Sequence, residues 1–351
     1  MFSRPIAPSF RVKSLRLTKR QASIHTLLLA ACLLIVSSGA AGATNVQAGS
    51  DKMITTASAV RVRSGPQVTA REVTRLKLGT VVSVLERSSG QDTIGQKQDY
   101  WYRVSLPDGK TGWVFGGLMT GFDPAHSAET YLRIASERLK LERAGFEDHV
   151  DLVNFLSRVV SSVREPETKA ELELDRLLAL KLSLEAIPFD KQEQPPYRAW
   201  TKARDAEVVY SEPAGQWLVR AQLLWDLQKK YRSLPIAERI AWEAARTFLP
   251  GECEGYIPCY VYLSRITDGE YLKLYPEGAH ARASLKSLSE YLAPIVADLK
   301  EKKTYEGPTD KSELAEMKKG LEELRAIVTK TSAPETEEVL KQINQVAQSY
   351  P

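Results

Sequence analysis

The feature that most constrains the fold is a change in the spacing of apolar residues near Asp123. Before it, apolar and polar residues alternate in short runs that end at turn residues, as in VRVRSGP (60–66). After it, apolar residues recur every three or four positions in longer runs. Alternation is typical of half-exposed β-strands, whereas the longer spacing is typical of amphipathic helices. The sequence therefore predicts a small β-rich part followed by a larger helical part.

The first 43 residues have the pattern of a secretory signal peptide. Six basic and no acidic residues precede the apolar run LLLAACLLIV (27–36), and small residues follow as far as Ala43. Ten apolar residues are too few to cross a bilayer. We therefore expect cleavage after Ala43, no transmembrane span in the mature chain, and an exported protein, either periplasmic or extracellular. A lipoprotein anchored through Cys32 is the less favoured alternative, because apolar residues continue beyond that cysteine.

Removal of this leader changes the charge of the chain. The whole sequence has 48 basic and 44 acidic residues, and six of the basic residues lie in the leader. The remainder is close to neutral, so nucleic acid is not an expected partner. Residues 51–122 nevertheless carry ten basic and six acidic side chains. This basic segment suits an anionic surface such as cell-wall polymer, or contact with the more acidic remainder of the chain.

The β-rich part contains short segments that read as strands of a small antiparallel barrel or sandwich. The expected strands are 59–63, 73–78, 81–87, 100–106 and 111–119, with the polar stretch 88–99 as a loop. Alternation predicts an inward-facing set and places the arginines of the opening stretch in solvent. The inward set is Val60, Val62, Val82, Val84, Tyr102, Val104 and Trp113.

Three motifs of this part, VRVRSGP, LKLGTVVSVLER and WYRVSLPDGKTGWV, together resemble the bacterial SH3-like (SH3b) domain over residues 52–120. The chain departs from the family pattern at Arg61, where the family has asparagine. The resemblance implies an SH3-like β-barrel that binds peptidoglycan or targets the protein to a surface.

The candidate ligand contacts are the aromatic residues Tyr100 and Trp101 and the basic residues Arg61 and Arg63. Trp101 is the strongest of these candidates, because it alternates with Tyr102 and is therefore expected to be exposed.

The second part is expected to be a helical bundle or repeat domain over residues 123–304, followed by a C-terminal helical pair over 310–349. Helices are predicted from Asp123, over 146–163, from a capping box formed by Thr168 and Glu171, and again from Pro213 onward. The stretch EYLKLYPEGAHARASL (270–285) is similar to a helix pair of tetratricopeptide-like proteins. The fold class is thus a multidomain β plus α chain.

The search for reactive groups gives few candidates. Cys253 and Cys259 lie six positions apart in GECEGYIPC and predict a local disulfide in an exported protein. No cofactor and no metal site are expected. The favoured hypothesis is an exported non-enzymatic binding or scaffold protein. Its SH3-type module is expected to contact cell-wall peptidoglycan or a protein partner such as an envelope protein, and its helical domain is expected to serve protein interaction. The alternative is a peptidoglycan-acting hydrolase with Glu252 or Glu254 as its acid.

Overall fold

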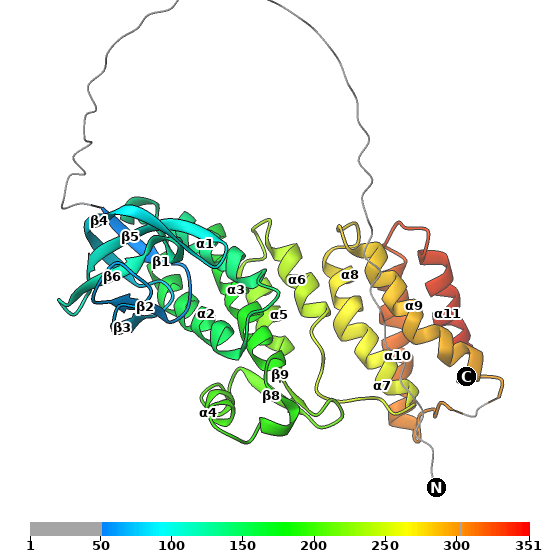
Figure 1. Cartoon of the computed structure of the whole chain (residues 1–351). Coiled ribbons are helices and arrows are strands. Elements are labelled where there is room, and N and C mark those ends of the chain that lie inside the picture. Colours follow the sequence, from blue (N-terminus) through cyan, green and yellow to red (C-terminus); the bar gives the residue numbers. More distant parts are fainter. Residues whose placement is uncertain (1–50, 302–303) are drawn as a thin grey trace, which may run out of the picture. The chain divides into compact units, whose positions relative to one another are not determined.

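The structure is a computed structural model that describes residues 51–301 and 304–351 (Figure 1). The predicted signal peptide, its cleavage site and Cys32 lie outside the described residues. Within the described ranges, no helix is both long and apolar enough to cross a membrane.

An antiparallel sheet opens the described chain. Its strands are β1 (Lys52–Thr55), β2 (Val60–Arg63), β3 (Glu72–Leu76), β4 (Val81–Ile94), β5 (Lys97–Ser105), β6 (Thr111–Phe115) and β7 (Met119–Gly121). They follow the order β3-β2-β6-β5-β4-β1-β7, and the sheet curls into a half-barrel (Figure 1). The predicted fold class, an SH3-like β domain followed by a helical domain, is confirmed.

The alternation of valine and arginine in VRVRSGP (60–66) sets the facing of β2. Val60 and Val62 are buried, Arg61 is exposed and Arg63 is partly exposed. The core of the sheet is completed by Leu76, Val82, Val104, Leu106, Val114 and Met119.

Two members of the predicted inward set are placed differently. Trp113 is not a core residue, because its neighbour Val114 takes the inward position of β6 and is fully buried. Val84 is only partly buried, since the register between β4 and β5 shifts between Val84 and Glu86.

The polar stretch 88–99 is a strand pair and not the expected loop. β4 and β5 continue past the core to a two-residue turn at Gly95 and Gln96, where Ile94 pairs with Lys97. Gly95 has a φ of +63°, a conformation that glycine accepts without steric cost. The polar side chains of this stretch can face water on a hairpin that extends beyond the hydrophobic core.

The remainder is mainly helical. Its helices are α1 (Ser127–Leu139), α2 (Phe146–Val159), α3 (Pro166–Glu185), α4 (Tyr197–Lys202), α5 (Ala221–Lys230), α6 (Ala237–Ala245), α7 (Ile257–Ser264), α8 (Glu270–Leu274), α9 (Ala281–Asp298), α10 (Lys311–Val328) and α11 (Thr336–Gln348). A short π-helix, η5 (Arg265–Gly269), joins α7 to α8.

Two helix predictions need correction. The cap of α3 is Glu165, whose carboxylate accepts hydrogen bonds from the backbone N–H groups of Glu167 and Thr168, instead of the expected capping box. The segment after Pro213 begins as a strand: β8 (Val208–Ser211) and β9 (Gln216–Val219) form a hairpin ahead of α5. Gly215, with a φ of +62°, permits the turn between these strands.

The sheet and the first helices share a hydrophobic core. Ile54 and Leu78, both fully buried, belong to the same cluster as Phe155 of α2 and Leu174 of α3. Helix α2 also binds both polar groups of the Leu78 backbone. The Leu78 N–H donates to Asp151 Oδ2 at 3.0 Å, and Arg158 Nη2 donates to the Leu78 carbonyl at 2.9 Å. The chain therefore contains a direct contact between its β and helical parts.

A second hydrophobic cluster joins side chains of the later helices, α6 to α11. Its fully buried members include Tyr271 of α8, Leu288 of α9 and Leu324 of α10. The tetratricopeptide-like stretch 270–285 falls on α8 and the start of α9.

Candidate functional site

The register of the sheet aligns a row of polar side chains across five neighbouring strands. At the centre of the row, Trp113 of β6 pairs with Arg63 of β2 on one side and with Arg103 of β5 on the other. At its two ends, Arg63 pairs with Glu72 of β3, and Arg103 pairs with Glu86 of β4. Residues paired directly across strands point to the same face. This arginine–tryptophan row therefore places a partly exposed indole ring between two guanidinium groups, on the face opposite the core.

Arg61 and Arg75 extend the row by a second pair of basic side chains. They pair across β2 and β3, and both contact Glu72: Arg61 Nε lies 3.2 Å and Arg75 Nε 2.8 Å from its carboxylate. The hydrogen bond from Arg75 is the main reason that the pKa of Glu72 is lowered. At the other end of the row, Arg103 Nη2 lies 3.0 Å from Glu86 Oε2.

The face is basic overall. It contains two glutamates, Glu72 and Glu86, and four arginines, Arg61, Arg63, Arg75 and Arg103. Ion pairs between exposed side chains are weak, so an anionic ligand can compete for these arginines. The side chain of Arg63 is also held by a backbone group, since Arg63 Nη1 donates to the Ala70 carbonyl at 2.8 Å.

The expectation that Trp101 is exposed is wrong. Only 3% of its surface is accessible. Its ring meets Phe115 edge-on with 5.7 Å between centroids, and its indole N–H donates to Asp92 Oδ2 at 2.5 Å. Asp92 belongs to the extended β4–β5 hairpin, which the sequence did not predict. Trp101 thus anchors this hairpin and presents little surface to a ligand.

The other sequence-predicted contacts are divided between two faces. Arg61 and Arg63 lie together on the face of the row. Tyr100 points to the opposite side of β5, because it is an odd number of residues from Arg103. There its partly buried ring lies under the guanidinium of Arg87, 4.2 Å from the ring centroid.

Sequence reasoning missed Arg103 and the outward position of Trp113. In TGWVF (111–115) three apolar residues are consecutive, so alternation alone leaves two possible facings. The signal that could decide between them is Gly112. A Cβ at this position would lie 2.5 Å from Val62 Cγ1 of the core, which identifies Gly112 as inward and Trp113 as outward.

The cysteine loop lies far along the chain and ends within the first turn of α7. Cys253 and Cys259 form a disulfide with their Cα atoms 5.4 Å apart. The flanking Glu252 and Glu254 are both exposed. A catalytic acid usually lies in an apolar surrounding, whereas both of these side chains lie in solvent. No metal-binding group of His, Cys, Asp and Glu side chains is found among residues 51–301 and 304–351.

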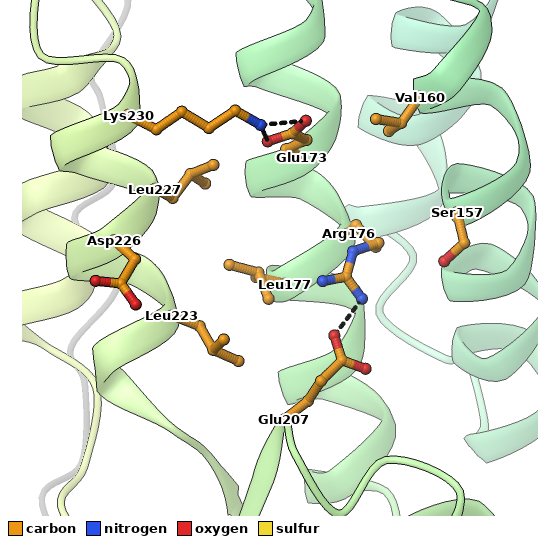
Figure 2. A pocket seen from close by; sticks show the side chains of 10 residues that line it. All are labelled: Ser157, Val160, Glu173, Arg176, Leu177, Glu207, Leu223, Asp226, Leu227 and Lys230. Carbon is orange, nitrogen blue, oxygen red and sulfur yellow. Dashed lines mark hydrogen bonds and ion pairs between the residues drawn. The ribbon is translucent and has the colours of Figure 1, made fainter.

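The helical part contains an open pocket of about 510 Å³ between α2, α3 and α5 (Figure 2). Two ion pairs bridge its walls: Lys230 Nζ lies 2.6 Å from Glu173, and Arg176 Nη1 lies 2.6 Å from Glu207. Figure 2 shows Leu177 between these two pairs. Because the charged groups already satisfy one another, we interpret this pocket as an inter-helix contact.

The curled sheet and its solvated basic face define a small SH3-like binding module. Comparison with known families agrees: the model described as "Bacterial SH3 domain" matches residues 58–120. The resemblance predicted from the sequence is therefore confirmed for this segment. Domains of this kind are typically modules that bind cell wall or protein.

A curated relative adds little about function. An uncharacterized protein of Treponema pallidum (strain Nichols) is 33% identical over 72 residues. The match covers 20% of this chain and 16% of that protein.

Proposed function

We propose that this protein is an exported, non-enzymatic binding protein of the cell envelope, whose SH3 domain contacts peptidoglycan through the arginine–tryptophan row. The observation that carries the proposal is the position of Trp113 between Arg63 and Arg103 on a basic, solvated sheet face. Its export rests on the leader pattern of residues 1–43.

The chemistry of this face fits a polymer of sugars and short peptides that carry carboxylates. Arginine offers planar pairs of N–H donors that match a carboxylate. Tryptophan offers a large apolar ring with one polar N–H, a combination suited to partly wet surfaces. The row supplies both groups side by side, with the ring between the donors.

The helical part supports a second role, contact with an envelope protein. Phe248 and Tyr262 expose 72% and 53% of their surface, and Tyr291 exposes 41%. Phe248 and Tyr291 also line a groove of about 340 Å³ beside the disulfide loop. Exposed aromatic side chains are enriched where proteins bind one another.

Co-sedimentation of residues 44–351 with purified sacculi tests the wall-binding role. Trp113→Ala and the double variant Arg63→Ala/Arg103→Ala are each expected to weaken retention about tenfold, since central aromatic and arginine contacts commonly carry this much binding energy. Raising the salt concentration from 50 to 500 mM should weaken retention of the unaltered chain as well.

Arg232→Ala is the matched control, because Arg232 is exposed on the helical part. Equal retention of the control and of the row variants would contradict the proposal. A zymogram of the same preparation addresses the hydrolase alternative: clearing that disappears in Glu252→Gln would replace a binding role with an enzymatic one.

A further inference from the structure

A different pocket, of about 620 Å³, lies between α1, α3 and α6. Leu132 and Leu139 of α1 and Leu178 of α3 give it an apolar lining. It does not include any residue of the SH3 domain or of the pocket in Figure 2.

The pocket contains a buried carboxyl group without a hydrogen-bond donor. Asp175 of α3 is only 4% exposed, yet neither of its carboxylate oxygens accepts a hydrogen bond from the described residues. Its nearest cationic atom is Arg239 Nη2, at 3.7 Å. Arg239 is engaged elsewhere, because its Nη1 donates to both oxygens of Glu171 at 2.6 and 2.8 Å. The Asp175 carboxyl therefore lines the pocket with one distant ion-pair partner and without a hydrogen-bond donor, so it can accept a hydrogen bond from a ligand.

An unpaired cation lines the same pocket. The side chain of Lys140, which follows α1, is exposed and forms no ion pair with any residue of the described ranges. The pocket thus offers a carboxyl group without a hydrogen-bond donor, a lysine without an ion-pair partner and a hydrocarbon lining.

We propose that this pocket binds a small aliphatic zwitterion, a molecule with one ammonium group and one carboxylate on a hydrocarbon body. The ammonium group donates to Asp175, the carboxylate pairs with Lys140, and the hydrocarbon body packs on Leu139 and Leu178. Glu171 lies beside Asp175 on α3 and strengthens the preference for a cation at that end. This proposal is independent of wall binding by the SH3 domain.

The charged groups that face Asp175 predict a pH dependence. Burial, followed by the neighbouring charge of Glu171, raises its pKa to about 7, and Arg239 opposes this shift. Glu167 and Lys140 line the rim of the same pocket. An ammonium ligand prefers the ionised carboxylate, whose population rises about tenfold between pH 6 and pH 8. The affinity is expected to rise by about the same factor.

Ligand-detected NMR with residues 44–351 tests the proposal with four probes. L-norleucine and 6-aminohexanoate are isomers that place the two charges on one carbon or at opposite ends of the chain. Hexylamine lacks the carboxylate, and hexanoate lacks the ammonium group. For one of the two isomers, the NMR signal of binding should saturate with a dissociation constant of about 1 mM, a typical weak affinity for a ligand of this size. Hexylamine should bind more weakly, and hexanoate should not bind measurably.

Two variants locate the binding. Asp175→Asn should lower the affinity about tenfold and abolish its pH dependence, whereas Lys140→Gln should reduce zwitterion binding to the level of hexylamine. Asp226→Asn is the matched control, because Asp226 is exposed at the pocket of Figure 2. If Asp175→Asn fails to fold, Lys140→Gln and the probe series still decide. Absence of saturable binding for both zwitterions at 50 mM, or equal binding of hexanoate, overturns the proposal.

Discussion

At the scale of single residues, the most informative side chains are those whose surroundings contradict their chemistry. Trp101 carries an aromatic ring that the sequence marks as a ligand contact, yet this ring is buried against Phe115. Asp175 carries a charge that normally seeks water, yet it is buried in α3. Burial thus gives Trp101 a structural role, while for Asp175 it predicts a dependence of stability on pH.

Asp175→Asn is expected to make the protein more stable at neutral pH. The pKa of Asp175 is raised to about 7 in the folded chain, above its ordinary value of 3.8. A raised pKa means that the folded state favours the neutral acid. The stability that this provides is complete below about pH 4 and is lost as the pH rises to about 7. The difference in unfolding free energy between variant and parent should therefore grow by about 3 kcal/mol from pH 5 to pH 8. Urea unfolding at the two pH values measures it, and a difference independent of pH would contradict this account.

At the scale of elements, the contact between the β3–β4 turn and α2 depends on one glycine. Gly79 has a φ of +76°, and a Cβ there would lie 2.1 Å from Phe155 Cδ2. The residue before it, Leu78, is the one whose backbone is bound by Asp151 and Arg158 of α2. A side chain at position 79 would therefore separate the two elements.

Gly79→Ala should lower the free energy of unfolding by about 3 kcal/mol, because backbone strain adds to a steric clash. Gly109→Ala is the matched control: Gly109 also has a positive φ, of +80°, but a Cβ there has no neighbour within 4 Å. Gly109→Ala should lower the free energy of unfolding by about 1 kcal/mol, because only the backbone strain contributes. Denaturant unfolding measures both values, and equal losses would show that the contact with Phe155 does not matter.

The strands differ in how well the sequence predicts them. Val60 and Val62 were predictable because they alternate strictly with charged residues. The β4–β5 hairpin was not, since Ser88 to Asp99 contain almost no apolar residues and their pairing depends on the turn at Gly95. The strand at 216–219 was read as the start of a helix, because QWLV runs directly into the apolar pattern of α5.

The candidate site was predictable in part for a related reason. Arg61 and Arg63 follow from alternation within one strand. The position of Arg103 beside Trp113 requires the register between β5 and β6, which no single strand contains.

At the scale of the whole described chain, one core connects Ile54 and Leu78 of the β part to the helices α1 to α6, and a second core stabilises α6 to α11. Leu78 belongs to the first of these although it lies in the β part of the chain. This arrangement predicts that the β part and the first helices lose structure together.

Leu78→Ala should lower the free energy of unfolding by about 3 kcal/mol, a typical loss for a buried leucine. Amide hydrogen exchange should become faster in both β1 and α3, because Ile54 of β1 and the buried leucines of α3 pack in the same core as Leu78. Leu321→Ala in the second core is the comparison and should accelerate exchange first in α10 and its neighbours. Faster exchange limited to the sheet in Leu78→Ala would show that the two parts open separately.

The attachment of Leu78 to α2 also has a mechanical consequence. Asp151 and Arg158 hold the N–H and the carbonyl of a single residue, Leu78, and Phe155 covers the next residue, Gly79. A force applied to the outer face of the sheet would therefore act directly on these hydrogen bonds, because no flexible linker separates Leu78 from α2. When the sheet binds a rigid surface, the orientation of α2 relative to that surface would be fixed as well. The helices that pack on α2 would then keep one orientation to the surface.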